Sequence, residues 1–330
     1  MARVLSGMRP TGPLHLGHLL GALDKWVELQ KTDDCFFMVA DLHALMGEYE
    51  NPAQIHKNSM EMVIDWLSCG IDPKKSTLFV QSQVPEHAEL ALILGMLTPL
   101  GWLERNPTYK EQLREIEGRD LTTFGFLGYP VLQAADILLY KGEKVPVGED
   151  QLSHLELTRE IVRRFNALYK KQVFPEPKAL LTKQGRILGT DRRKMSKSYG
   201  NAINLSDPEE VVQKKISSMI TDPQRVRLTD PGHPEACNVY SYYQTFGEPA
   251  KTAQVYDWCT QAKKGCTECK RELAKIVDGA RLQDIRSERK KYESDTSALE
   301  KIIREGRVRA REVARKTLDE VKAVLHLMVD

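Results

Sequence analysis

The sequence has no apolar run close to the roughly 20 consecutive residues that a membrane-spanning helix needs. The first residues, Met1–Gly7, contain too few apolar side chains for the core of a secretory signal. Internal repeats and low-complexity linkers are also absent. The formal net charge is only +2, so nucleic-acid binding must be argued from local patches and not from the total. We therefore expect a soluble, cytoplasmic globular protein with no membrane partner.

The composition is that of an ordinary globular protein, with 41% apolar and 28% charged residues in a chain of 330. Apolar runs at Val4–Leu5, Cys35–Ala40 and Ser76–Ser82 have the character of buried strands, and a helical pattern covers 52–69. Alternating strands and helices predict a parallel sheet with helices on both faces. The expected fold is therefore α/β, with a doubly wound, Rossmann-type nucleotide-binding domain.

After this region the pattern becomes increasingly helical. A polar stretch near 104–125 is expected to be a mostly helical insertion. Beyond it we expect a helix over 128–140 entered through Pro130, a strand over 144–147 and a helix over 152–169. From about Asp207 the pattern is almost purely helical. We therefore expect two domains, 1–205 and 206–330.

The last predicted helix carries one apolar stripe. Its members recur at steps of three and four residues and are Ala314, Leu318, Val321, Leu325 and Met328. Such a stripe predicts that the helix packs on something, and we expect it to return to the α/β body.

The stretch Met8–His18 (MRPTGPLHLGH) lies between the first strand and the first helix. A Gly- and Pro-rich turn before a helix directs backbone N–H groups and the helix N-terminus at whatever lies above the sheet, and phosphate is the ligand that suits them. His15 and His18 lie three residues apart and so share one face of the first helical turn. By itself this pattern is also typical of a plain turn with solvated histidines.

A second cationic element, Lys194–Ser198 (KMSKS), occurs late in the predicted domain. Its two lysines suit a polyphosphate. Together the two stretches resemble the HIGH and KMSKS elements of class I aminoacyl-tRNA synthetases, in their order and in their wide separation. The resemblance implies ATP binding through the second element, that is Lys194, Met195, Ser196, Lys197 and Ser198.

Asp136 is the most informative single acid. It shares a helix face with Gln133 and Tyr129, and its neighbours are apolar. A carboxylate in such surroundings needs a partner. The ordinary interpretation is a structural ion pair or hydrogen bond. The alternative is an acceptor for a polar N–H or O–H group of an otherwise apolar ligand.

The run from Tyr129 to Tyr140, followed by VPVGEDQ at 145–151 and HLELTR at 154–159, resembles tryptophanyl-tRNA synthetases across the catalytic half. The resemblance implies that Asp136 holds the indole N–H, with Gln133 and Tyr129 beside it. It also implies ATP contacts by Arg9, Pro10, Thr11, Gly17, His18, Gly148, Glu149, Asp150 and Ile187. The set Tyr129, Gln133 and Asp136 also resembles the site of the sister tyrosyl-tRNA synthetases, whereas VPVGEDQ and the C-terminal half favour tryptophan.

The reaction implied by this resemblance has two steps. Tryptophan and ATP give tryptophanyl-adenylate and pyrophosphate, and the terminal adenosine of tRNA(Trp) then accepts the amino acid. His15 and His18 would donate to the phosphates, and Lys194 and Lys197 would neutralise the pyrophosphate, with Mg²⁺ assisting. The resemblance also implies a homodimer. A nucleotidyltransferase or a non-catalytic paralogue on the same scaffold remains an alternative, although complete phosphate-binding elements and a long helical half argue against both.

Four cysteines cluster in the helical half: Cys237, Cys259, Cys266 and Cys269, spaced C-x21-C-x6-C-x2-C. Four soft ligands in a cytosolic protein suggest a metal rather than disulfides. The spacing matches neither common zinc knuckles nor ferredoxin runs, so it leaves Zn²⁺ and a [4Fe–4S] cluster open. The resemblance favours the cluster, because some thermophilic tryptophanyl-tRNA synthetases carry one in the anticodon-binding domain at nearly this spacing.

Residues 281–316 are basic, with twelve Lys and Arg against seven Asp and Glu. A solvated helix face is the ordinary explanation of such a run. A footprint for the tRNA backbone is the functional one, and the family resemblance makes 206–330 the anticodon-binding domain.

Overall fold

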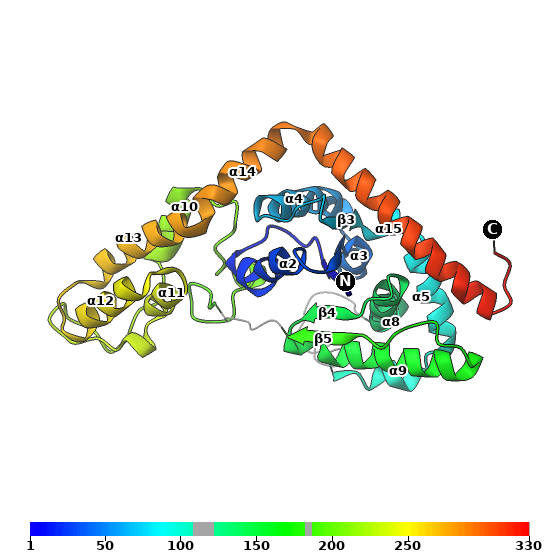
Figure 1. Ribbon diagram of the computed structural model, residues 1–330. Coiled ribbons are helices and arrows are strands. Elements are labelled where there is room, and N and C mark those ends of the chain that lie inside the picture. Colours follow the sequence, from blue (N-terminus) through cyan, green and yellow to red (C-terminus); the bar gives the residue numbers. More distant parts are fainter. Residues whose placement is uncertain (108–121, 182–186, 330) are drawn as a thin grey trace.

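The computed structural model describes residues 1–107, 122–181 and 187–329 (Figure 1). Its centre is a five-stranded sheet of order β3-β2-β1-β4-β5, in which each neighbouring pair is parallel. The strands are β1 (Arg3–Met8), β2 (Asp34–Val39), β3 (Ser76–Val80), β4 (Lys144–Val147) and β5 (Lys178–Leu181). This sheet with its flanking helices confirms the expected Rossmann-type α/β fold. The strand order reverses at β1, and ligands of such sheets bind beyond the carboxyl ends of the strands at that point.

Helices follow strands β1 to β4 and then dominate the C-terminal part. In chain order they are α1 (Leu16–His18), α2 (Asp24–Leu29), α3 (Asp41–Glu48), α4 (Ile55–Ser68), α5 (Glu86–Leu97), α6 (Leu100–Glu104), α8 (Phe124–Leu139), α9 (Leu152–Tyr169), α10 (Glu209–Ser217), α11 (Asn238–Phe246), α12 (Pro249–Thr260), α13 (Cys266–Val277), α14 (Gln283–Ser294) and α15 (Thr296–Val324). Single π-helical turns, Leu19–Leu23 and Asp278–Leu282, join α1 to α2 and α13 to α14. Short 3₁₀ turns include η3 (Gln81–Gln83), η4 (Glu149–Gln151) and η5 (Lys197–Tyr199).

The sheet separates two hydrophobic cores because successive side chains of a strand point to opposite faces. On β2, Cys35, Phe37 and Val39 belong to one core, and Phe36 and Met38 belong to the other. The first core also holds residues of α2, α4 and α10–α14, and the second holds residues of α5, α8 and α9; α15 contributes its first half to the first core and its second half to the second. The central strand β2 is therefore apolar on both faces, which is why it is a near-continuous hydrophobic run in the sequence.

The long helix α15 covers the edge strand β3 (Figure 1). Gly306 lies so close that an added Cβ would overlap the carbonyl oxygen of Leu78 on β3. Arg309 donates to the carbonyls of Pro73 and Ser76, at 3.0 and 3.3 Å. A helix laid along an edge strand in this way takes up backbone groups that would otherwise be exposed for pairing with another chain.

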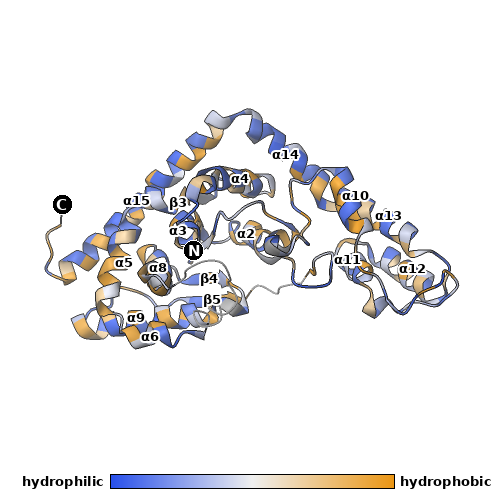
Figure 2. Ribbon diagram, turned by 180° about the vertical axis from the view of Figure 1, so that it is seen from behind, coloured by the Kyte–Doolittle hydropathy of each residue, from blue (hydrophilic) through white to orange (hydrophobic). Residues whose placement is uncertain are grey.

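Ion pairs tie the rest of the helical part to the α/β body. Arg289 of α14 is 4% exposed and forms hydrogen bonds with Asp65 and, at 2.5 Å, with Glu61 of α4. Arg281 donates to Asp24 of α2 at 2.6 Å. Figure 2 shows α14 and α15 with alternating hydrophilic and hydrophobic patches, the pattern of helices that have one buried and one solvated side.

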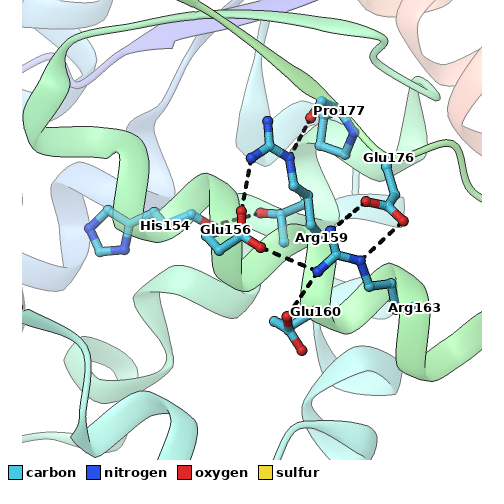
Figure 3. A network of polar contacts seen from close by, with 8 residues as sticks. His154, Glu156, Arg159, Glu160, Arg163, Glu176 and Pro177 are labelled. Atoms are coloured by element: carbon cyan, nitrogen blue, oxygen red, sulfur yellow. Dashed lines mark hydrogen bonds and ion pairs between the residues drawn. The ribbon is translucent and has the colours of Figure 1, made fainter.

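A contrasting network lies on the surface of α9 (Figure 3). Arg163 forms ion pairs with Glu156, Glu160 and Glu176 at 2.7–3.3 Å, and its side chain is 48% exposed. Exposed pairs of this kind contribute little to stability because water screens both partners.

Three expectations from the sequence need correction or restriction. Pro130 does not open its helix: α8 already starts at Phe124, because Thr123 accepts a hydrogen bond from the Phe126 N–H at 3.2 Å and caps the helix there. The apolar stripe of α15 ends before Met328, which is 95% exposed beyond the last helical turn. Most of the predicted insertion near 104–125 lies outside the described residues. Within the described part of the chain, no helix is long and apolar enough to cross a membrane.

Candidate active site

The turn between β1 and α1 places two histidines side by side beyond the carboxyl end of β1. Gly12 adopts a φ of 119°, a left-handed value that favours glycine. His15 then caps α1: its Nδ1 accepts from the Gly17 N–H at 3.1 Å, and its own N–H donates to His18 Nδ1 at 3.2 Å. The two ring centroids lie 3.8 Å apart. Because both Nδ1 atoms accept, each neutral ring carries its proton on Nε2, which can donate to a ligand.

Burial keeps these two histidines neutral. It lowers the pKa of His15 to about 4, with a smaller contribution from the nearby ammonium of Lys197. It also lowers the pKa of His18 well below its usual value, and His15 and Lys197 add to the effect. At neutral pH the pair therefore supplies hydrogen-bond donors and not positive charge.

Positive charge reaches this turn from the late lysine element. The Lys197 ammonium donates to the Gly12 carbonyl oxygen at 2.8 Å, across 185 residues of sequence. The chain that follows is also bound to the turn, since the Leu16 N–H donates to the Ile203 carbonyl at 3.0 Å. Burial lowers the pKa of Lys197 to about 8, and Asp65 partly opposes this effect. The two motifs found in the sequence therefore meet in one place.

Asn201 fixes the shape of the lysine loop. Its Oδ1 accepts from the Ser196 N–H at 2.9 Å, and its Nδ2 donates to the Lys194 carbonyl at 3.1 Å. Met195 is buried, whereas the Lys194 side chain is exposed. The structure thus holds Lys197 against the turn and leaves the Lys194 ammonium on the solvent side.

Other residues predicted to bind the nucleotide surround the same turn. Ile187 lies against Gly17, where an added Cβ would be 3.9 Å from its Cγ2. Gly148 directly follows β4, the strand beside β1, and starts η4. Arg9 and Thr11 are exposed and Pro10 is buried. Glu149 is exposed, and the side chains of Asp150 and Ser198 lie outside the described set.

Asp136 lies on α8 and is 2% exposed. Its Oδ1 accepts from Gln81 Nε2 at 2.7 Å and lies 2.6 Å from His87 Nδ1, while its Oδ2 lies 2.7 Å from His43 Nε2. Burial raises the pKa of this carboxyl, but His43 and His87 outweigh that effect and hold it below the usual value. Asp136 is therefore an ionised, hydrogen-bonded acceptor inside the protein.

Tyr129 and Gln133 lie on the same helix as Asp136, as predicted. The Tyr129 ring contacts the rings of His43 and His154 edge-on, with centroids 4.9 and 5.0 Å away. Three buried polar atoms near this helix have no partner in the described part of the structure: His43 Nδ1, Gln81 Oε1 and Gln133 Oε1. Buried polar atoms without partners are uncommon in folded proteins, so these three can accept or donate a hydrogen bond to a polar ligand or to ordered water.

The sequence interpretation missed His43, Gln81 and His87. A signal for the first two existed, because His43 follows β2 and Gln81 directly follows β3. Polar residues just after parallel strands gather at the carboxyl edge of the sheet, where ligands bind.

The four clustered cysteines lie away from this site, in the helical part. All four line one small cavity, together with Arg225 and Trp258. Burial raises the pKa of the Cys237 and Cys259 thiols and raises that of Cys269 to about 12. Among the described residues, no three His, Cys, Asp or Glu side chains are grouped tightly enough to hold a metal ion.

Comparison with known proteins gives consistent matches over almost the whole chain. Residues 1–280 match the family model of class I tRNA synthetases for tryptophan and tyrosine (W and Y). A tryptophan–tRNA ligase of Thermotoga maritima is 52% identical over 328 residues, with 99% of each chain covered. One from Aquifex aeolicus is 45% identical over 395 aligned positions, covering 98% of this chain and 100% of the relative.

Known structures agree with the sequence matches. The tryptophanyl-tRNA synthetase of Campylobacter jejuni, crystallised with ADP and tryptophan, superposes with a TM-score of 0.91 at 33% identity. The match covers 98% of this chain and 100% of that one. A tyrosyl-tRNA synthetase of Archaeoglobus fulgidus reaches a TM-score of 0.66 at 20% identity, which shows a shared fold alone.

Proposed function

The chain belongs to the class I tRNA synthetases for tryptophan and tyrosine and is an aminoacyl-tRNA synthetase, and from this premise we propose how it makes tryptophanyl-tRNA. Its function is that of a tryptophan–tRNA ligase. L-Tryptophan and ATP give tryptophanyl-adenylate and pyrophosphate, and the amino acid then passes to the terminal adenosine of tRNA(Trp). The observation that carries the site assignment is the contact between Lys197 and Gly12, which supports one triphosphate site built from both motifs.

In the first step a tryptophan carboxylate oxygen attacks the α-phosphorus of ATP. A new P–O bond forms, the bond between the α-phosphorus and the bridging oxygen breaks, and that oxygen leaves with pyrophosphate. We assign phosphate contacts to the Nε2–H groups of His15 and His18, which are neutral donors on a rigid helical cap. Lys197, with Lys194, Met195, Ser196 and Ser198 in its loop, carries the charge that offsets the charge on pyrophosphate.

The ribose and base end of ATP is assigned to the residues around this turn. They are Arg9, Pro10, Thr11, Gly17, Gly148, Glu149, Asp150 and Ile187. Mg²⁺ accompanies the phosphates of ATP and spreads their negative charge when it is bound. The protein contributes mainly position and fixed charge, which is what a phosphoryl-centred reaction needs.

Tryptophan binding is assigned to the region of Asp136, Gln133 and Tyr129. The ionised carboxylate of Asp136 suits the indole N–H, the one polar group of an otherwise apolar ring. An acceptor buried in this way disfavours a ligand that lacks the N–H, because the acceptor would go unpaired. The unpartnered oxygen of Gln133 suits a further N–H donor of the substrate.

The second step and tRNA binding are assigned from the family resemblance. A ribose hydroxyl of the terminal adenosine, the 2′-OH in class I enzymes, attacks the adenylate carbonyl and releases AMP. We divide the chain into a catalytic part, 1–205, and an anticodon-binding part, 206–330, and propose a homodimer. On α15, Arg304, Arg307 and Arg315 are exposed and suit the phosphate backbone of tRNA.

An exchange assay tests the assignment of the lysine loop. Lys194→Ala should lower the ATP–pyrophosphate exchange rate by orders of magnitude and leave tryptophan affinity unchanged, because Lys194 is exposed and holds no part of the amino acid site. The matched control is Lys31→Ala, an exposed lysine before β2 at the opposite end of the strands. An unchanged rate in Lys194→Ala would remove the role of this residue. Exchange with tyrosine in place of tryptophan would overturn the amino acid assignment.

We further propose a [4Fe–4S] cluster that links the helices of the C-terminal part, with Zn²⁺ as the alternative. Support for it is the single cavity that Cys237, Cys259, Cys266 and Cys269 line together. These thiols would hold the cluster as thiolates, and the cluster would act as a structural link. Anaerobically purified protein should absorb at about 400 nm and contain iron. Cys266→Ala should lose that absorption, whereas Cys69→Ala, outside the cavity, should keep it; a colourless protein with stoichiometric zinc would reject the cluster.

A further inference from the structure

Asp136 is the centre of a buried hydrogen-bonded chain that reaches away from the ligand region. His87 Nδ1 lies 2.6 Å from Asp136 Oδ1, and His87 Nε2 lies 2.9 Å from Tyr140 Oη. Both His87 and Tyr140 are 0% exposed. Tyr140 is the C-cap residue of α8, four residues beyond Asp136, and His87 is on α5, which packs against α8. His87 therefore contacts the Asp136 carboxylate directly, and the Tyr140 hydroxyl reaches it only through His87.

The contacts of Asp136 divide its two oxygens into different roles. Oδ1 takes two partners, Gln81 Nε2 and His87 Nδ1, whereas Oδ2 takes one, His43 Nε2. An ionised carboxylate has about four acceptor positions, two on each oxygen. Oδ1 is therefore saturated, and one position remains on Oδ2. A ligand N–H that binds Asp136 binds there.

The proton on His87 decides whether Oδ1 stays saturated. In a neutral imidazole one nitrogen donates and the other accepts. The Tyr140 hydroxyl can donate to Nε2, which makes Nε2 the acceptor and puts the ring proton on Nδ1, facing Asp136. Without that hydroxyl the ring can place its proton on Nε2, and a lone pair on Nδ1 would then face the carboxylate. Burial and the charge of Asp136 raise the pKa of Tyr140, so its hydroxyl stays protonated and able to donate.

His43 differs from His87 in this respect. Its Nε2 contacts Asp136, but its Nδ1 has no partner in the described part of the structure. Among the residues that the structure describes, no hydroxyl comparable to that of Tyr140 fixes the tautomer of His43. The backing role therefore belongs to His87 and Tyr140.

We propose that Tyr140 and His87 form a positioning pair that saturates Oδ1 of Asp136 and leaves Oδ2 as the acceptor that selects an aromatic N–H. The pair acts through Asp136 and does not touch the substrate. This inference rests on the proposed role of Asp136 in binding the indole. It predicts that selection for the N–H depends on the Tyr140 hydroxyl, which contacts Asp136 only through His87.

The test compares tryptophan with an analogue that carries sulfur in place of the ring N–H, 3-(benzothiophen-3-yl)alanine. Wild-type enzyme should prefer tryptophan in kcat/KM for ATP–pyrophosphate exchange. Tyr140→Phe should reduce that preference about tenfold, the usual scale of one hydrogen bond to a charged group. The kcat/KM of the sulfur analogue should stay unchanged, because the analogue makes no hydrogen bond to Oδ2. Tyr169→Phe is the matched control, a tyrosine of α9 whose hydroxyl has no contact to Asp136.

A second variant isolates the tautomer argument. His87→Asn places an amide N–H where Nδ1 stands, and an amide cannot move its proton. Tyr140→Phe should therefore change the preference in the wild-type background and leave it unchanged in the His87→Asn background. His87→Leu, which donates nothing, should lose the preference even with Tyr140 intact, and this comparison does not depend on the folding of Tyr140→Phe.

The outcomes separate the two proposals. If wild-type enzyme accepts both amino acids equally, the role of Asp136 fails and the positioning pair fails with it. If the wild type selects tryptophan but Tyr140→Phe slows both substrates equally, Asp136 keeps its role and Tyr140 is merely structural. An equal effect of Tyr140→Phe in both His87 backgrounds would likewise overturn the positioning pair.

Discussion

The buried pair of Arg289 and Asp65 permits a quantitative prediction. Arg289 is the arginine of α14 that enters the α/β body, and Asp65 on α4 is 3% exposed. The perturbation is Arg289→Met, which keeps much of the side-chain volume and removes the charge. Asp65 then loses the cation that is hydrogen-bonded to it. Removing one partner of a buried ion pair costs about 3–5 kcal/mol, because the other charge stays desolvated.

The cost should depend on pH because Asp65 can take up a proton. Burial raises its pKa to about 6 even though Arg289 opposes the shift. A raised pKa means that the folded state binds the proton more tightly than the unfolded state. Stability from this group is therefore present at low pH and is lost as the pH rises through about 6. Arg289→Met raises the pKa of Asp65 further, so the loss should be about 4 kcal/mol at pH 8 and about 2 kcal/mol at pH 5, where mainly hydrogen bonds are lost.

Urea unfolding at pH 5 and pH 8 measures both values. Trp26 and Trp66 form a buried pair in this core, 5.1 Å apart between centroids, and their fluorescence reports its unfolding. Adding Asp65→Asn to Arg289→Met should recover stability at pH 8. The control is Arg163→Met in the exposed network of α9, which should leave the midpoint unchanged. Equal losses at the two pH values, or an equal loss in the control, would refute the reasoning.

Three further predictions concern the α15 contact, the lysine loop and tRNA binding. Gly306→Ala should lower the free energy of unfolding by about 3 kcal/mol because the new methyl group meets the Leu78 carbonyl. Gly95→Ala, in open space on α5, should raise it by about 0.5–1 kcal/mol. Thermal unfolding compares the two variants, and similar melting points would count against the close contact. The exchange rate should fall as the pH rises through about 8, where Lys197 loses its proton. In Lys197→Arg this fall in rate should occur at higher pH. If the fall stays at the same pH, it belongs to another group. Arg307→Ala should weaken tRNA binding and reduce its salt dependence by about one unit without changing exchange, and a filter-binding salt series in which the slope stays the same would exclude this contact.

The larger features of the fold could be predicted because they follow from hydrophobic periodicity. The strands at Cys35–Ala40 and Ser76–Ser82 are apolar on both faces, so a sheet covered on both sides was the natural inference. β5 (Lys178–Leu181) was not predicted, since it is short, lies at the edge of the sheet and leaves Leu181 55% exposed. The start of α8 was predicted at the wrong residue, Pro130, because the Thr123 cap seven residues earlier had already started the helix.

The residues of the candidate site also fall into those that could be predicted from the sequence and those that could not. The histidine and lysine motifs are local in sequence, so their residue types pointed to phosphate without a structure. The partners of Asp136 are not local: Gln81 and His87 lie 55 and 49 residues away from it. Only the packing of α5 on α8 and the order of the strands bring them together, and no spacing rule within one segment encodes that distance. The closeness of Lys197 to Gly12 is likewise a property of the folded chain.

The covering of β3 by α15 has a consequence for synthesis on the ribosome. The strand is synthesised within the first quarter of these 330 residues, whereas the helix that shields its open edge follows more than 200 residues later. For most of its synthesis the nascent chain therefore presents a bare strand edge. Molecular chaperones that recognise extended backbone can bind this edge during that time, and the edge is covered once α15 has been made and has folded onto it.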